Sequence, residues 1–174
     1  MKRVILVGFM GCGKSSLGKK LANRMNIPFL DSDAEIERIA QKSIGEIFGE
    51  HGESYFRTLE RNYIQSLRMS DEFVLAAGGG MPCFDTNMDL LNEIGTTFYL
   101  ERSPRELNSR LREAKKQRPL IEGMTDEDRL NYIEDKLSQR EEFYKQATFV
   151  LSREEQTAET IAELILLLQP HQTS

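Results

Sequence analysis

The chain has 174 residues, of which 39% are hydrophobic, and this length and composition predict one globular domain with its own core. The formal net charge of -5 argues against a nucleic-acid or membrane-surface role, because both favour an excess of positive charge. No apolar run approaches the roughly 20 residues that span a bilayer, and the short apolar run at residues 4–7 does not predict a signal peptide. The two cysteines, Cys12 and Cys83, lack the spacing of a zinc site or a disulfide framework, so we expect a reducing, cytoplasmic setting.

Short apolar runs alternate with helical stretches along the whole chain. Five such runs, each bounded by Gly, Pro or polar residues, are strand candidates: residues 4–7, 29–31, 73–77, 97–100 and 149–151. Four stretches are helix candidates: residues 14–25, 53–68, 126–146 and 157–168. A further helix begins at Ser103, where Pro104 and Glu106 complete a helix-start signal, and extends to about Arg112. This alternation predicts a parallel sheet with helices on both faces, followed by a frayed tail at residues 169–174.

The strongest functional signal is the segment GFMGCGKS at residues 8–15, which matches the phosphate-loop pattern G-x-x-x-x-G-K-[ST]. It follows the first predicted strand and opens the first helix, which is the context that the pattern requires. The simpler alternative is a glycine-rich turn that only joins a strand to a helix. The glycines let the backbone wrap around phosphate oxygens, and the helix N-terminus adds a favourable dipole. We expect Lys14 to bridge the outer phosphates of ATP and Ser15 to ligate Mg²⁺. The predicted ATP-binding residues of this region are Gly11, Cys12, Gly13, Lys14, Ser15 and Ser16.

Two aspartates on alternate residues, Asp31 and Asp33, end the second predicted strand. A carboxylate at a strand end is expected as a further anchor for the metal in a phosphate-loop site. Only one of the two needs to face the metal, so we assign Asp31 to Mg²⁺ through water and Asp33 to the acceptor. Alternatively, either aspartate simply caps the helix that begins near Ala34.

In the order and identity of its motifs, the chain resembles the shikimate kinase family from Val7 to about Ala147. The matching segments are GFMGCGKS at 8–15, DSD at 31–33, SIGEIF at 43–48, GE at 52–53, FR at 56–57 with Glu60, GGG at 78–80, RPL at 118–120, and Arg140 with Tyr144. The resemblance implies an α/β fold of the P-loop kinase type, in three layers, with a five-stranded parallel sheet flanked by helices. It also implies one domain over residues 1–174, a substrate-binding region at about 33–60 and a mobile lid at about 112–125. In the family, a monomeric enzyme uses ATP to phosphorylate the 3-hydroxyl of shikimate, a step in the synthesis of chorismate and aromatic amino acids.

Shikimate is a small ring acid with one carboxylate and three hydroxyls, so its site needs cations and hydrogen-bond partners. Arg57 and Arg140 would hold the carboxylate through paired N–H donors. Asp33 would accept hydrogen bonds from the hydroxyls and orient the attacking one, either as a base or only as a positioner. Three residues at the end of the third strand would let the ligand approach backbone amides: Gly78, Gly79 and Gly80.

Simpler explanations stay open for each of these residues. Glu53 and Glu60 lie four residues before and three residues after Arg57, which is the spacing of surface ion pairs on a helix. Arg140 lies in a highly charged helical stretch, where a solvated position is the default. Three glycines by themselves are also compatible with a flexible turn.

Positive charge is concentrated around the predicted lid of this acidic chain, as closure over a triphosphate requires. Arg118 corresponds to the lid arginine of the family and would reach the transferring phosphate. It is therefore a predicted catalytic residue, together with Lys14 and Asp33. Arg110 resembles the family arginine that stacks on adenine, and Arg153 would lie nearby in the ATP site.

Two other functions compete with this interpretation. A related small-molecule kinase, such as a gluconate kinase, would share the phosphate loop and the lid. It would not need the combination of Asp33, Arg57, the three glycines and Arg140. A regulatory module would bind ATP without phosphorylating an acceptor. The predicted partners are ATP and shikimate, and the predicted cofactor is Mg²⁺.

Overall fold

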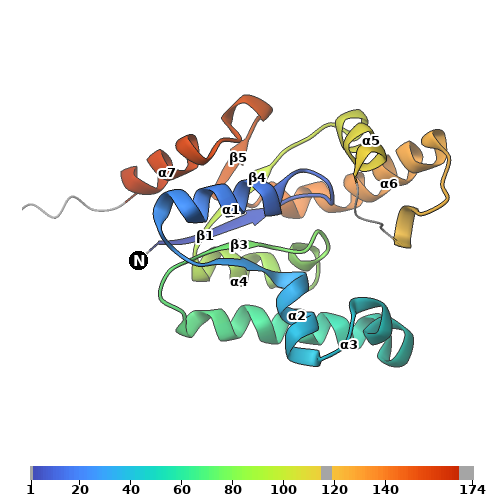
Figure 1. Ribbon diagram of the computed structural model, residues 1–174, viewed down its shortest axis with the longest axis horizontal. Helices are drawn as coiled ribbons and strands as arrows, with labels where there is room; N and C mark the ends of the chain where they lie inside the picture. Colours follow the sequence, from blue (N-terminus) through green and yellow to red (C-terminus); the bar gives the residue numbers. More distant parts are fainter. Residues whose placement is uncertain (1, 115–118, 169–174) are drawn as a thin grey trace, which may run out of the picture.

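A computed structural model describes residues 2–114 and 119–168, and these residues contain one sheet of five parallel strands. The strands are β1 (Arg3–Val7), β2 (Phe29–Asp31), β3 (Phe73–Ala76), β4 (Thr96–Leu100) and β5 (Phe149–Leu151). They lie in the spatial order β2-β3-β1-β4-β5 (Figure 1). The predicted five-stranded parallel sheet is confirmed, and every strand lies within about one residue of its predicted bounds.

The middle strand, β1, is fully buried over residues 4–7. Continuous apolar burial is expected there, because helices cover both faces of a parallel sheet. β1 pairs with β3 through Leu6 and Ala76, and with β4 through Val7 and Tyr99. Since the strands are parallel, the loops after β1 and β3 leave the sheet at the same edge. The strand order reverses beside β1, which is where α/β sheets commonly bind ligands.

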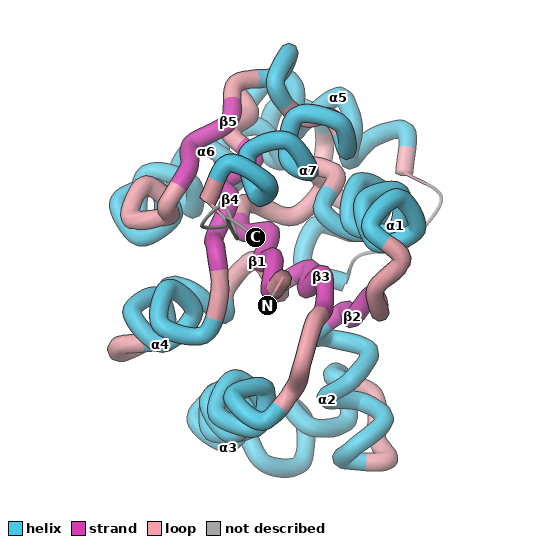
Figure 2. Tube along the Cα trace, turned by 90° about the vertical axis from the view of Figure 1, so that its left-hand side faces the viewer, coloured by secondary structure: helices cyan, strands magenta, loops and turns pink. Residues whose placement is uncertain are grey.

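Helices cover both faces of the sheet, so the predicted three-layer arrangement is confirmed. On one face, α1 (Lys14–Met25) and α7 (Ala158–Leu167) pack together, and the opposite face carries α3 (Ile44–Ser66) and α4 (Asn87–Ile94) (Figure 2). The other helices of the described residues are α2 (Ser32–Ala40), α5 (Pro104–Glu113) and α6 (Asp126–Tyr144). Short 3-10 turns occur at Leu67–Met69, Met81–Cys83, Pro119–Ile121 and Arg153–Glu155. No helix within residues 2–114 and 119–168 is both long and apolar enough to cross a membrane.

Two helices differ from the sequence prediction. α3 begins at Ile44 and not at residue 53, because Ser43 and Glu46 form a capping box that starts it earlier. It bends at Gly52, where a φ of +77° interrupts the helical period. α4 has no counterpart in the prediction, since it is only eight residues long and the side chain of Thr86 at its N-cap makes no capping hydrogen bond. The tail predicted to fray lies outside the described residues.

The predicted lid, at about 112–125, connects α5 to α6 and is described only in part. Its first residues complete α5, which begins at the predicted capping box of Ser103 and Glu106. Pro119–Ile121 form a 3-10 turn, and Gly123 has a φ of +76°. Residues 115–118 lie outside the described part of the chain. The lid and its motion therefore stay a prediction.

Candidate active site

A cavity of about 690 Å³ opens at the carboxyl end of the sheet, where the loops after β1 and β3 lie next to each other. Its wall combines the phosphate loop, the two aspartates and the first two residues of the glycine run, which we define as residues 78–80. The predicted site residues that line it include Lys14, Ser15, Ser16, Asp31, Asp33 and Arg110. A nucleotide and a small acceptor can therefore occupy one continuous space.

The phosphate loop has a backbone that only glycine adopts easily. Gly8, Gly11 and Gly13 have φ values of +140°, +81° and +112°, which side chains disfavour. A Cβ atom at Gly11 would also lie 2.9 Å from a methyl carbon of Leu111. The two glycines of the motif, Gly8 and Gly13, and the additional Gly11 thus occupy three positions where this loop has no room or no freedom for another residue.

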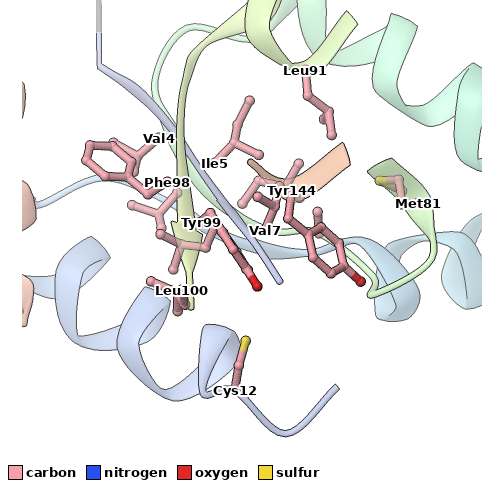
Figure 3. Close-up of a cluster of buried hydrophobic side chains, with 14 of the residues drawn as sticks. Val4, Ile5, Val7, Cys12, Met81, Leu91, Phe98, Tyr99, Leu100 and Tyr144 are labelled. Carbon is pink, nitrogen blue, oxygen red and sulfur yellow. The ribbon is translucent and has the colours of Figure 1, made fainter. Parts of the chain in front are cut away.

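The Lys14 side chain bends back over the loop. Its Nζ donates hydrogen bonds to the carbonyl oxygens of Gly8 (2.6 Å) and Phe9 (3.0 Å). The thiol of Cys12 is buried among core side chains (Figure 3). Its sulfur lies 3.6 Å from the same Nζ. Ser16, in the first turn of α1, lines the cavity beside the loop. The loop carbonyls therefore hold the ammonium group at the cavity wall.

Ser15 and Asp31 meet at one corner of the cavity. The Ser15 hydroxyl donates a hydrogen bond to Asp31 Oδ2 at 2.8 Å, and Asp31 Oδ1 accepts one from the amide of Asp33 at 3.2 Å. Asp31 therefore caps α2, as the alternative interpretation expected, while its other oxygen faces Ser15. The part of the chain that the structure describes holds no cluster of three His, Cys, Asp or Glu side chains for a metal. A hydroxyl beside a carboxylate fits Mg²⁺, which takes few protein oxygens and completes its shell with phosphate and water.

The glycine run lies next to three charged side chains, two of which occupy space that a larger residue would need. A Cβ atom at its first, second and third residue would lie 2.5 Å from Asp33 Oδ1, 3.8 Å from Arg140 Nη1 and 3.0 Å from both terminal nitrogens of Arg57. None of the three glycines has a positive φ, so the position requires their small size and not an unusual backbone. The predicted acceptor-binding side chains thus converge on one short segment, and a flexible turn alone would not explain this convergence.

Arg57 is held on several sides. Its guanidinium donates hydrogen bonds to Glu53 at 2.9 Å and to Glu60 at 2.7 Å, and its Cζ lies 3.7 Å from the centre of the Phe84 ring. The ion pairs expected from helical spacing are present, but the pair with Glu60 is internal, since that side chain is only 1% exposed. The aromatic ring and the two carboxylates fix the plane of the guanidinium, so its remaining N–H groups point in a defined direction.

Arg140 lies between the phosphate loop and the glycine run. Its Cζ is 5.7 Å from the centre of the Phe9 ring, and its Nη1 faces the second glycine. One helical turn further along α6, Tyr144 is buried and its hydroxyl donates a hydrogen bond to the Gly79 carbonyl. Burial raises the pKa of the nearby Cys83 thiol to about 11, which keeps this side chain neutral near pH 7. Arg140 is therefore half-buried between the phosphate loop and the glycine run and does not lie on a fully solvated helix face, while its role in binding the acceptor stays a prediction.

The three arginines predicted to contact ATP differ in their placement. Arg110 lines the cavity, and its Nε donates a hydrogen bond to the Gly11 carbonyl at 2.7 Å. Arg153 lies in the turn after β5 with its side chain 71% exposed, and its Nη1 is 3.6 Å from Glu106. This contact brings Arg153 beside α5, the helix that carries Arg110. Arg118 lies outside the described residues.

The structure adds contacts that the sequence did not assign. Phe84, which stacks on Arg57, carries no periodic or motif signal. Ser32 is fully buried between the two aspartates, and its Oγ accepts a hydrogen bond from the Gly78 amide at 2.7 Å. Tyr144 belongs to a matching motif but had no role, although its position four residues after Arg140 indicates that both share one face of a helix.

The Glu60 carboxyl gives the stability of the fold a testable pH dependence. Burial raises its pKa from 4.5 to about 7, although Arg57 opposes the shift. The folded chain therefore retains a proton that the unfolded chain releases between pH 4.5 and about 7. The contribution of this carboxyl to the free energy of unfolding is full below that window and is lost as the pH rises through it.

Urea denaturation of the wild type and of Glu60→Gln at several pH values measures this contribution. We expect the wild type to lose stability relative to the variant as the pH rises from 4.5 to about 7. Glu53→Gln removes the exposed partner of the same arginine and is the matched control. A difference that instead grows with pH would mean that the ion pair with Arg57 outweighs burial.

The chain is similar to shikimate kinases in both sequence and fold. A family model described as shikimate kinase matches residues 10–169. The shikimate kinase of Bacteroides fragilis is 42% identical to this chain over 98% of both chains. The crystal structure of shikimate kinase from Bacteroides thetaiotaomicron has a TM-score of 0.87 and 39% identity, over 96% of this chain and 98% of that one. A shikimate kinase from Acinetobacter baumannii, solved in complex with shikimate, has a TM-score of 0.79 and 33% identity, over 97% of this chain and 92% of that one.

A gluconokinase is also similar in structure, but at a lower level. The enzyme from Sinorhizobium meliloti has a TM-score of 0.58 and 16% identity, over 95% of this chain and 93% of that one, which shows a common fold alone. The shikimate kinase model, in contrast, spans most of the sequence, and the relatives that carry this name match it almost from end to end. The chain therefore belongs to the shikimate kinase family.

Proposed function

We propose that this chain transfers the γ-phosphoryl group of ATP to the 3-hydroxyl of shikimate, giving shikimate 3-phosphate and ADP. The observation that carries the proposal is the convergence of three charged side chains on the glycine run, whose first two residues line the same cavity as the phosphate loop and Asp33. The relative from Acinetobacter baumannii was solved in complex with shikimate, which supports the choice of acceptor. The protein is accordingly an ATP-dependent kinase whose acceptor is a small hydroxylated acid.

The phosphate loop would hold ATP by its triphosphate. Its amides and Lys14 would bind the outer phosphates, and the left-handed glycines of the loop support this assignment. Ser15 directly, and Asp31 through water, would hold Mg²⁺, which when bound neutralises charge on the phosphates. Arg118 would reach the transferring phosphate from the lid. The rest of the proposed ATP site comprises Gly11, Cys12, Gly13, Ser16, Arg110 and Arg153.

The acceptor would bind on the other side of the cavity, against the glycine run. Arg57 and Arg140 would hold its carboxylate, and amides of the run would donate hydrogen bonds to its hydroxyls. Asp33 would then orient the 3-hydroxyl toward the γ-phosphate and accept its proton as the bond to phosphorus forms. The transition state of phosphoryl transfer is loose, so alignment and charge neutralisation contribute more than the strength of the base.

The domain of residues 1–174 would act as a monomer in the cytoplasm, in the synthesis of aromatic amino acids. The region at about 33–60 would bind shikimate, and the lid at about 112–125 would close over ATP. Cys12 and Cys83 are free thiols, which suits a reducing compartment. The net charge of -5 supports our expectation that nucleic acids and membranes are not partners.

Acceptor-dependent release of ADP from Mg-ATP tests the proposal directly. We expect release in the presence of shikimate but not with gluconate or without an acceptor, because only shikimate matches two arginines, an aspartate and the glycine run. Lys14→Ala should abolish the release and serves as the background control. Release of ADP with gluconate alone would show that gluconate, and not shikimate, is the acceptor. Release that needs no acceptor would indicate an ATPase.

Gly78→Ala tests whether the glycine run makes room for the acceptor site. The new Cβ would lie 2.5 Å from Asp33 Oδ1, so the carboxylate would have to move away. We expect kcat/KM for shikimate to fall about 100-fold, the size of effect that a displacement of about 1 Å can cause. Gly49→Ala controls for an added methyl group, because Gly49 does not line the cavity and a Cβ there has no atom within 4 Å. Near-normal kcat/KM in Gly78→Ala would contradict the role given to Asp33.

A further inference from the structure

Hydrogen bonds hold every peptide group of the glycine run. Three of these bonds are local: the amides of Met81 and Cys83 donate to the carbonyls of the first and third glycine, at 3.0 Å and 3.1 Å, and the Cys83 thiol donates a weak one to the carbonyl of the second at 3.9 Å. Two more come from distant elements. The amide of the first glycine donates to Ser32 Oγ at 2.7 Å, and the carbonyl of the second glycine accepts from the Tyr144 hydroxyl. Ser32 at the start of α2 and Tyr144 at the end of α6 therefore bind the glycine run from two sides.

The planarity of the peptide group links these contacts to the acceptor. In a trans peptide the C=O and the next N–H point in opposite directions, and none of the described residues has a cis peptide. The Tyr144 bond to the Gly79 carbonyl therefore turns the Gly80 amide away from Tyr144. The Met81 bond to the Gly78 carbonyl likewise sets the direction of the Gly79 amide. Neither of these two amides donates a hydrogen bond within the described residues, so both are available to a ligand.

Glycine makes such external anchors necessary. A residue without a Cβ rotates its neighbouring peptide planes with little steric hindrance, and three in succession give the segment wide backbone freedom. Ordering that freedom at the moment of binding would reduce affinity for the acceptor. A run that needs small residues for space must therefore obtain its rigidity from other segments of the chain.

We propose that Ser32 and Tyr144 are positioning residues for the acceptor: Ser32 anchors the first peptide group of the glycine run, and Tyr144 fixes the peptide plane that carries the Gly80 amide, so that the free amides of the run face the acceptor. The inference rests on the proposed function and adds two residues that do not line the cavity.

The surroundings of both residues support this role. Ser32 is fully buried and lies between Asp31 and Asp33, so its bond ties the glycine run to the strand end that carries the aspartates. Tyr144 is also fully buried, and Figure 3 shows its hydroxyl pointing toward the segment that precedes Met81. Its ring packs against Tyr99, with ring centroids 5.2 Å apart. This contact holds the ring, and therefore the direction of the C–O bond that carries the hydroxyl.

Steady-state kinetics of Tyr144→Phe and Ser32→Ala, with each substrate varied in turn, test the inference. The first variant keeps the ring and removes only the anchoring hydroxyl. We expect the KM for shikimate to rise about tenfold in each variant, the loss of roughly one hydrogen bond, with the KM for ATP unchanged. Tyr63→Phe is the matched control, because its buried hydroxyl has no partner among the described residues. This control should leave both KM values unchanged.

Three results would overturn the inference. An unchanged KM for shikimate in both variants would show that the anchors do not position the acceptor. Equal rises in both KM values would indicate a structural role without selectivity for the acceptor. A wild-type protein that does not phosphorylate shikimate would overturn the proposed function as well, and this is seen before any variant is made. Should Tyr144→Phe not fold, Ser32→Ala applies the same test from the other side of the run.

Discussion

Space at the end of β3 is the constraint on which the acceptor site depends. Three consecutive residues there have no side chain: the volume left by the first and third is taken by Asp33 and Arg57, and Arg140 lies within contact distance of the second. These three side chains come from three different helices. The parallel sheet makes this position useful for catalysis. Because β3 pairs with β1, the glycine run lies against the phosphate loop, with the Cβ position of Gly79 only 3.3 Å from the amide nitrogen of Met10. Phosphate donor and acceptor can therefore meet at one edge of the sheet.

Arg57, on the acceptor side of the site, is held in place by Glu60, whose burial costs free energy. Glu60 is 1% exposed, and burial of a carboxylate is unfavourable unless the group is paired. Arg57 provides that pairing, while Phe84 covers one face of its guanidinium. A guanidinium that is already oriented loses little freedom when it binds a carboxylate. This arrangement suits phosphoryl transfer, in which alignment and charge neutralisation lower the barrier more than base strength does.

The features that depend on neighbouring residues were predictable from the sequence, and those that depend on distant contacts were not. The phosphate loop, the five strands and the capping box at Ser103 each follow from a local pattern, and the structure confirms them. Phe84 meets Arg57 only in the folded chain, and nothing nearby in the sequence distinguishes it from other phenylalanines. Tyr144 reaches Gly79 across 65 positions, so its spacing could suggest a helix face but not the partner.

The position of the phosphate on the product tests the central claim most directly, because in the proposed site Asp33 and the two arginines determine which hydroxyl faces ATP. Shikimate can be incubated with the protein and Mg-ATP, and the product examined by NMR for coupling between phosphorus and the ring protons. The account predicts one product, in which phosphorus couples to the proton on the carbon that bears the 3-hydroxyl. Coupling to a different ring proton, or no phosphorylated shikimate at all, would contradict it.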